Sequence, residues 1–213
     1  MNKNKNFSIL SVTAVAAAIV LAGCANGGGS TSGSGASPAE TAAAAASAAA
    51  TTGAAAEHNE ADTMFAQMMI PHHAQAVEMS DMILKKQDIP AEVTALATQI
   101  KAAQAPEIEK MAGWLKSWNE SATPSAGAHS GHGSVGMSGM MSAEDMSKLD
   151  AARGTDAARL FLTQMIAHHE GAVMMAKTEE SGGKNPEAIE LSKTIIRAQE
   201  KEIQEMKDLL AKL

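Results

Sequence analysis

The chain carries a pair of adjacent histidines, flanked by methionines, in two places: MMIPHHAQAVEM at residues 68–79 and QMIAHHEGAVMM at residues 164–175. Thioether sulfur together with imidazole suits Cu(I), and imidazole with carboxylate also suits Cu(II) or zinc. These repeated side chains are the first candidates for chemistry and predict a metal site, with copper as the expected ion and zinc as the alternative. The candidate ligands are His72, His73, His168 and His169, with Met69 and Met165 beside them.

Helical spacing brings these side chains together, because residues three and four apart on a helix are neighbours. The first histidine of each pair falls on an apolar stripe, where a core leucine would be expected. The second histidine lies about 100° around the helix, at the flank of the stripe. The two stripes are Phe65, Met69, His72, Ala76, Met79 and Ile83, and Phe161, Met165, His168, Ala172 and Met175.

Two later apolar stripes are each interrupted by a glutamine and a glutamate, Gln104 with Glu107 and Gln199 with Glu202. A buried carboxylate costs several kcal/mol, roughly, unless it is paired, hydrogen-bonded or bound to a cation. We therefore expect both glutamates to face the histidines across a helical hairpin, accepting an imidazole N–H or ligating a metal. The second-rank candidate ligands are Met79, Met175, Glu107 and Glu202.

A second candidate group lies among glycines and serines and consists of His129, His132, Met137, Met140 and Met141. A mobile segment of this composition would capture Cu(I) or Ag(I) and pass the ion inward. The alternative is a connector whose methionines dock on the folded domain.

The elements that position these residues are predicted to be helices at residues 62–86, 90–118, 142–152, 154–182 and from 186 to the C-terminus. Asp88 is expected to cap the second of them, with Pro90 in its first turn. No stretch alternates with a two-residue period, which predicts no sheet. The repeated motifs lie 96 residues apart, so the sequence predicts an all-α four-helix bundle made of two duplicated hairpins.

The chain begins with a predicted export signal at residues 1–23. Its last residues, Leu21-Ala22-Gly23-Cys24, resemble a bacterial lipobox, which implies that Cys24 carries lipid; the alternative is a signal peptide with an incidental cysteine. The lipobox implies a membrane-anchored lipoprotein on the outer side of the cytoplasmic membrane or in the periplasm. The apolar run of about 16 residues is short for a transmembrane helix, which needs about 20.

The predicted organisation continues with the lipidated cysteine and a flexible Ala/Gly/Ser tether at residues 24–58. The bundle domain at residues 59–213 comprises repeat one at 59–118, a linker at 119–141 and repeat two at 142–213. Cys24 is the only cysteine, so the exported domain has no thiolate site and no internal disulfide. A formal net charge of −7 without a basic patch argues against nucleic-acid binding.

The double histidines, Gly139-Met-Met-Ser142 and the run from Phe161 to Ala172 resemble the bacterial family catalogued as domain of unknown function 305. The resemblance covers roughly residues 59–213. It implies a ferritin-like fold, and some members are exported copper-binding proteins linked to copper tolerance.

Three classes of function follow from these features. The first is a lipid-anchored protein, not an enzyme, that buffers or scavenges copper, with a partner protein that the sequence does not identify. The second is a structural or interaction lipoprotein whose core histidines are hydrogen-bonded. The third is a metalloenzyme with an open coordination position. Di-iron chemistry is disfavoured, because its Glu-x-x-His motif is missing and methionine precedes His72 and His168 by three residues.

Overall fold

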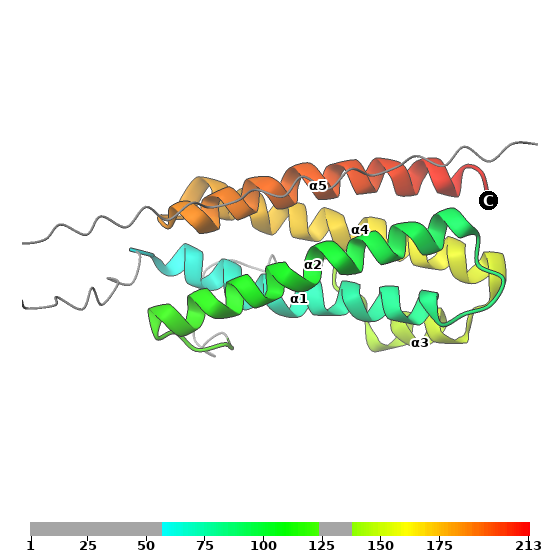
Figure 1. Cartoon of the computed structure of the whole chain (residues 1–213), viewed down its shortest axis with the longest axis horizontal. Coiled ribbons are helices and arrows are strands. Elements are labelled where there is room, and N and C mark those ends of the chain that lie inside the picture. Colours follow the sequence, from blue (N-terminus) through cyan, green and yellow to red (C-terminus); the bar gives the residue numbers. More distant parts are fainter. Residues whose placement is uncertain (1–56, 124–137) are drawn as a thin grey trace, which may run out of the picture. The chain divides into compact units, whose positions relative to one another are not determined.

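A computed structural model describes residues 57–123 and 138–213, and all regular structure in these ranges is helical (Figure 1). The helices are α1 (Glu60–Leu84), α2 (Ala91–Trp118), α3 (Ala143–Ala151), α4 (Gly154–Gly182) and α5 (Pro186–Leu210). The predicted all-α class is therefore confirmed, and each predicted helix is present. Within the described ranges, no helix is long and apolar enough to cross a membrane. The predicted signal, Cys24, most of the tether, His129, His132 and Met137 lie outside the described residues.

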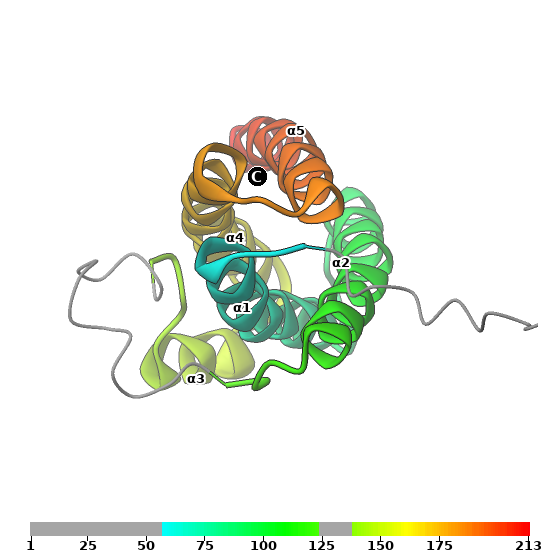
Figure 2. The same ribbon diagram turned by 90° about the vertical axis from the view of Figure 1, so that its left-hand side faces the viewer.

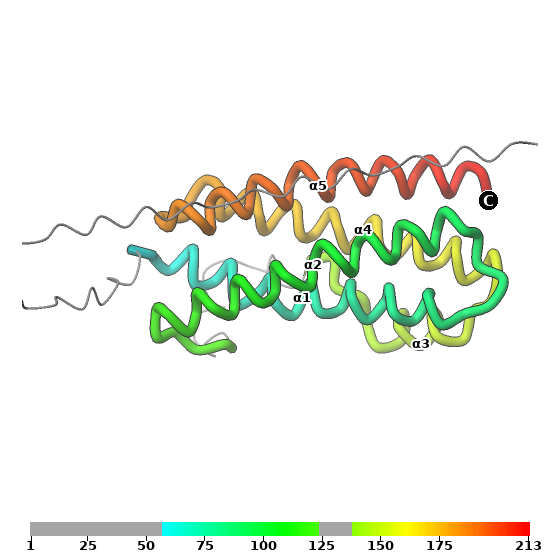
Figure 3. The backbone as a smooth tube through the Cα atoms, in the orientation of Figure 1, coloured from blue at the N-terminus to red at the C-terminus, as the bar shows by residue number. Residues whose placement is uncertain are grey.

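The four long helices form two antiparallel hairpins, α1 with α2 and α4 with α5. α1 and α5 run in one direction along the bundle, and α2 and α4 run in the other (Figure 3). The two hairpins meet mainly where α1 packs against α4, and the short α3 lies outside them against both of these helices (Figure 2). α1 and α4, which carry the histidine pairs, are therefore the helices at the seam between the repeats.

Local sequence explains where the helices begin. Asn59 and Asp62 form a reciprocal capping box at the start of α1. Asn185 caps α5 through its side chain, with Pro186 at the first helical position, as predicted.

The predicted start of α2 is wrong. Pro90 is itself the cap residue, with an extended ψ of 138° and no side-chain hydrogen bond, and the helix begins at Ala91. Asp88 lies in the preceding turn with a φ of 60°. This short turn uses a left-handed residue to reverse the chain, and aspartate is one of the few residues that tolerate that conformation.

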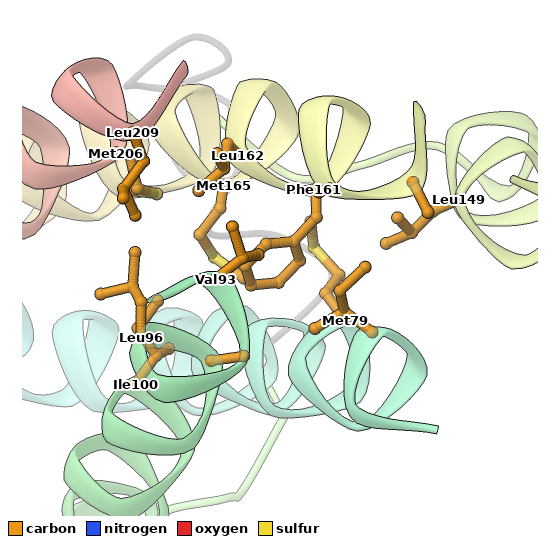
Figure 4. Packing of buried hydrophobic residues seen from close by; sticks show 14 of the residues in the cluster. Met79, Val93, Leu96, Ile100, Leu149, Phe161, Leu162, Met165, Met206 and Leu209 are labelled. Carbon is orange, nitrogen blue, oxygen red and sulfur yellow. The ribbon is translucent and has the colours of Figure 1, made fainter. Parts of the chain in front are cut away.

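The core consists of two apolar clusters (Figure 4 shows the first). The α3-side cluster includes Met79, Ile83, Leu96, Ile100, Leu149, Phe161, Leu162, Met165 and Met206. The tryptophan cluster includes Phe65, Met69, Met111, Trp114, Trp118, Ala172, Met175 and Ile195. On every long helix, the membership changes from one cluster to the other at the position of the histidines or of the Gln/Glu interruption. The polar residues therefore form a layer across the middle of the bundle.

Candidate metal centre

The four histidines of the repeated motif are buried in this layer, and none is more than 1 % exposed. His72 on α1 and His168 on α4 meet at the seam between the hairpins. Their ring centroids are 3.7 Å apart, and the ring planes are inclined by 37°. The duplicated motifs are thus brought face to face at the centre of the bundle.

The second histidine of each pair contacts the glutamate of its own hairpin. His73 Nε2 lies 2.8 Å from Glu107 Oε2, and His169 Nε2 lies 2.8 Å from Glu202 Oε2. This confirms that the two glutamates face the histidines across each hairpin. A carboxylate can only accept, so a neutral ring in this contact donates from Nε2 and keeps the lone pair of Nδ1.

The two pairs differ in their access to water. The Glu202 side chain is 7 % exposed, whereas the Glu107 side chain is 20 % exposed. Glu202 also accepts a long hydrogen bond of 3.4 Å from Gln99 Nε2. The pair in repeat two is therefore the more enclosed of the two.

Six buried ring nitrogens in the layer have no hydrogen-bond partner within the described residues. They are both nitrogens of His72, both nitrogens of His168, and Nδ1 of His73 and of His169. Nearly all buried polar groups in folded proteins are satisfied by protein, water or ligand. This concentration of free nitrogens is therefore the feature of the core that calls for a ligand.

The electrostatics favour neutral imidazole. Burial, reinforced by neighbouring His73, lowers the pKa of His72 to about 3, although the backbone of Ser138 partly opposes the shift. Burial also lowers the pKa of His168, with His72 as the next cause. Burial lowers the pKa of His169, while the Glu202 carboxylate works in the opposite direction. A neutral ring keeps the lone pair that a metal ion needs.

Methionine sulfur flanks the layer on both sides. Met79 and Met165 belong to the α3-side cluster, where they lie near Phe161 (Figure 4). Met69 and Met175 belong to the tryptophan cluster. Each side of the layer therefore has one methionine from α1 and one from α4, and all four are at least 95 % buried.

Carboxylate and imidazole groups alone do not form a metal site here. Among the described residues, no three His, Cys, Asp or Glu side chains are gathered closely enough to hold an ion. The donor types fit copper, but binding one ion between the repeats requires a ring to turn or sulfur to participate.

The described part of the predicted capture segment is docked on the bundle. Met140 and Met141 are partly buried, and Met141 packs on the α3-side cluster. The backbone of Met141 also exchanges two hydrogen bonds with the Gln75 side chain. Gln75 was not among the predicted site residues. The available signal was its mismatch with Gly171, the equivalent position in the second motif.

Comparison with known proteins identifies the family. A family model described as "Domain of unknown function (DUF305)" matches residues 62–210. The chain belongs to the DUF305 family. The predicted family is thereby confirmed, whereas the ferritin-like relationship stays a prediction. No curated protein matches the chain.

Solved structures of this family share the fold. A candidate secreted DUF305 protein from Streptomyces coelicolor is 37 % identical, with a TM-score of 0.67 over 71 % of this chain and 93 % of that one. A DUF305 fragment from Deinococcus radiodurans is 29 % identical, with a TM-score of 0.63 over 73 % and 98 %. CopM in its Cu(I)-bound form is 32 % identical, with a TM-score of 0.57 over 71 % and 96 %. CopM has also been solved in Cu(II)-bound and silver-bound forms.

Proposed function

We propose that this DUF305 protein is exported and binds copper, and that its buried histidine layer holds the ion. The observation that carries the proposal is the set of six ring nitrogens, on four buried histidines of the polar layer, that have no hydrogen-bond partner among the described residues. The similarity to CopM, solved with Cu(I), Cu(II) and silver, supports the same class of cargo.

The histidines, glutamates and methionines of the layer have different roles in the proposed site. His72 and His168 are the primary ligands, since neither nitrogen of either ring has a hydrogen-bond partner among the described residues. Glu107 and Glu202 hold the rings of His73 and His169 in place, as carboxylates do behind metal-bound histidines. Met69 and Met165 supply thioether sulfur, which needs no deprotonation and suits Cu(I) outside the cytoplasm.

The proposed role is sequestration or buffering, not catalysis. Full burial of the four histidines leaves no exposed face on which a substrate would react. Lipid on Cys24 and the Ala/Gly/Ser-rich segment after it would tether the bundle to a membrane. The lipobox-like sequence and the candidate secreted relative support export.

A purely structural layer is the competing function. The bonds from His73 to Glu107 and from His169 to Glu202 favour it, because each satisfies a buried group without any metal. This alternative leaves six ring nitrogens without a role.

The deciding experiment is an anaerobic Cu(I) titration of the purified chain against a chelating competitor, followed by Cu(II) and Zn(II). We expect binding tighter than about micromolar. Joint His72→Ala and His168→Ala changes should weaken binding by about tenfold or more, equivalent to at least 1.4 kcal/mol. His58→Ala, outside the layer, is the control. Absence of binding would favour the structural role. Unchanged affinity in the double variant would move the site to His129, His132 and the neighbouring methionines.

A further inference from the structure

The short segment Ser138–Met141, which leads into α3, is attached to α1 by a two-way amide contact. The Met141 N–H donates to Gln75 Oε1 at 2.7 Å, and Gln75 Nε2 donates to the Met141 carbonyl at 2.9 Å. Gln75 lies three residues after His72, so it is less than one helical turn away. One side chain thus fixes the backbone of this segment beside the histidine layer.

The same segment lies directly on the backbone of α4. Gly139 has a φ of 82°, and a Cβ added there would lie 2.7 Å from the Ala167 carbonyl oxygen and 2.9 Å from that of His168. A Cβ added to Gly171 would collide with the carbonyl of Ser138. Two glycines are therefore required for this close approach. The segment touches α4 at the turn that carries His168.

The contacts of the segment span the two helices that carry the His72–His168 pair. Its hydrogen bonds to Gln75 on α1 and its close approach to the backbone of Ala167 and His168 on α4 lie within about one helical turn of the two rings.

Gln75 and Gly171 occupy equivalent positions in the two repeats, 96 residues apart, but one has a long side chain and the other has none. On α1, the Gln75 side chain forms hydrogen bonds with the segment. On α4, the absence of a side chain at Gly171 lets the segment approach the helix. Neither residue bonds a histidine of the layer. The duplicated motif has therefore diverged where it holds the covering segment.

We propose that Ser138–Met141 is an opening cover over the His72–His168 pair, that copper ions enter beneath it, and that Gln75 and Gly171 are the positioning residues that keep it closed. The inference rests on the proposed function for the identity of the ion. Segments held by few contacts open locally without global unfolding. Here the attachment consists of two hydrogen bonds, the close backbone approach at Gly139 and Gly171, and the partly buried Met141.

Two variants release the cover by different means. Gln75→Leu removes both hydrogen bonds, and Gly171→Ala pushes the Ser138 carbonyl away. Gln204→Leu, which removes a local bond to Asp208, and Gly113→Ala, where a Cβ meets nothing within 4 Å, are the matched controls.

The first measurement uses metal-free protein and follows modification of His72 and His168 by diethyl pyrocarbonate with peptide mass spectrometry. Loss of two hydrogen bonds should raise the modification rate of both rings by about 5- to 30-fold, with the controls unchanged. A wild-type rate in both release variants would overturn the proposal. So would an equal rise at His58, which would indicate general loosening.

The second measurement is the rate of Cu(I) association by stopped flow. We expect faster association in both release variants, by about the same factor as the modification rate. Association at the wild-type rate would overturn the cover as the entry route even with copper affinity intact. If copper does not bind at all, the proposed function fails, and the modification rates still decide whether the segment covers the rings.

Discussion

The imidazole rings of His72 and His168 face each other with their centroids 3.7 Å apart and their planes inclined by 37°, where α1 meets α4. Two protonated rings at this separation would repel each other strongly in a site from which water is excluded. Burial and the neighbouring histidines therefore keep the pair neutral. The centre of the bundle thus contains neutral imidazole rings at positions where the stripes would otherwise place apolar side chains.

The first prediction concerns the charge of His72. Its pKa is lowered to about 3, so the ring stays neutral at pH 5 in the metal-free protein. Nitrogen-15 chemical shifts of the ring, followed from pH 7 to pH 4, should show no protonation of His72 above pH 5. A titration midpoint near 6.5, the ordinary histidine value, would contradict the burial of the His72 ring.

The second prediction compares the two histidine–glutamate pairs. Glu202→Ala removes the partner of a buried N–H and should lower the free energy of unfolding by about 1–3 kcal/mol. Glu107→Ala should lower it by about half as much, because the more exposed position lets water replace the carboxylate. Urea unfolding at constant pH measures both changes in the free energy of unfolding.

Glu200→Ala is the control, since its bond to Lys177 is exposed and worth at most about 1 kcal/mol. Equal losses at Glu107 and Glu202 would show that solvent access does not distinguish the pairs.

The helices, and the inward orientation of the polar residues that form the layer, could be predicted from sequence. Both follow from a 3.6-residue period repeated over long segments. α1 was expected at residues 62–86 and occupies Glu60–Leu84. Glu107 and Glu202 could be placed opposite the histidines because a carboxylate on an apolar stripe needs a partner.

Other features depend on contacts that periodicity does not encode. The spacing places His72 and His168 on their stripes, but the close contact of the two rings depends on how α1 and α4 meet. Docking of the linker methionines on the bundle was one of the two sequence-based interpretations. Gln75 and Gly171 could not be identified as the partners, because Ser138–Met141 has no period that fixes its position. The metal roles of the predicted ligands stay predictions.

A buried pair of carboxyl groups joins one end of α1 to the turn between α4 and α5. Asp62 accepts the backbone N–H groups of Lys184 at 3.1 Å and Asn185 at 2.8 Å. Glu179 lies beside it and is 1 % exposed. Burial, together with a hydrogen bond and charge repulsion from Asp62, raises the pKa of Glu179 to about 8. Although burial works against it, the bonds to Glu179 and these N–H groups lower the pKa of Asp62.

The third prediction is a pH dependence of stability that arises from Glu179. Its pKa is higher in the folded chain, about 8, than its ordinary value of 4.5, so the folded state holds the proton more tightly. This stabilisation is complete below about pH 4.5 and is lost as the pH rises to about 8. Glu179→Gln cannot ionise and should be more stable than the wild-type chain at pH 8, by roughly 2–4 kcal/mol.

Urea unfolding between pH 4.5 and pH 8.5 tests this dependence. The difference between the two proteins should grow with pH and level off above about pH 8. The exposed neighbour Glu180 provides the matched control, since Glu180→Gln should follow the wild-type curve. A parallel pair of curves for Glu179→Gln and the wild type would rule out the protonated carboxyl.

The fourth prediction separates the sulfur ligands from the nitrogen ligands. Met69 and Met165 are fully buried on opposite sides of the histidine layer. Replacing both with leucine conserves volume, so each change should cost less than about 1.5 kcal/mol of stability. Because thioether sulfur prefers Cu(I), the double variant should lose about tenfold or more in Cu(I) affinity and keep its Zn(II) affinity.

Met82→Leu and Met146→Leu, at the edge of the α3-side cluster, are the controls. Competition titrations of all variants provide the comparison. Equal losses for Cu(I) and Zn(II) would point to a repacked core, and no loss for either would leave the histidines as the only ligands in the layer.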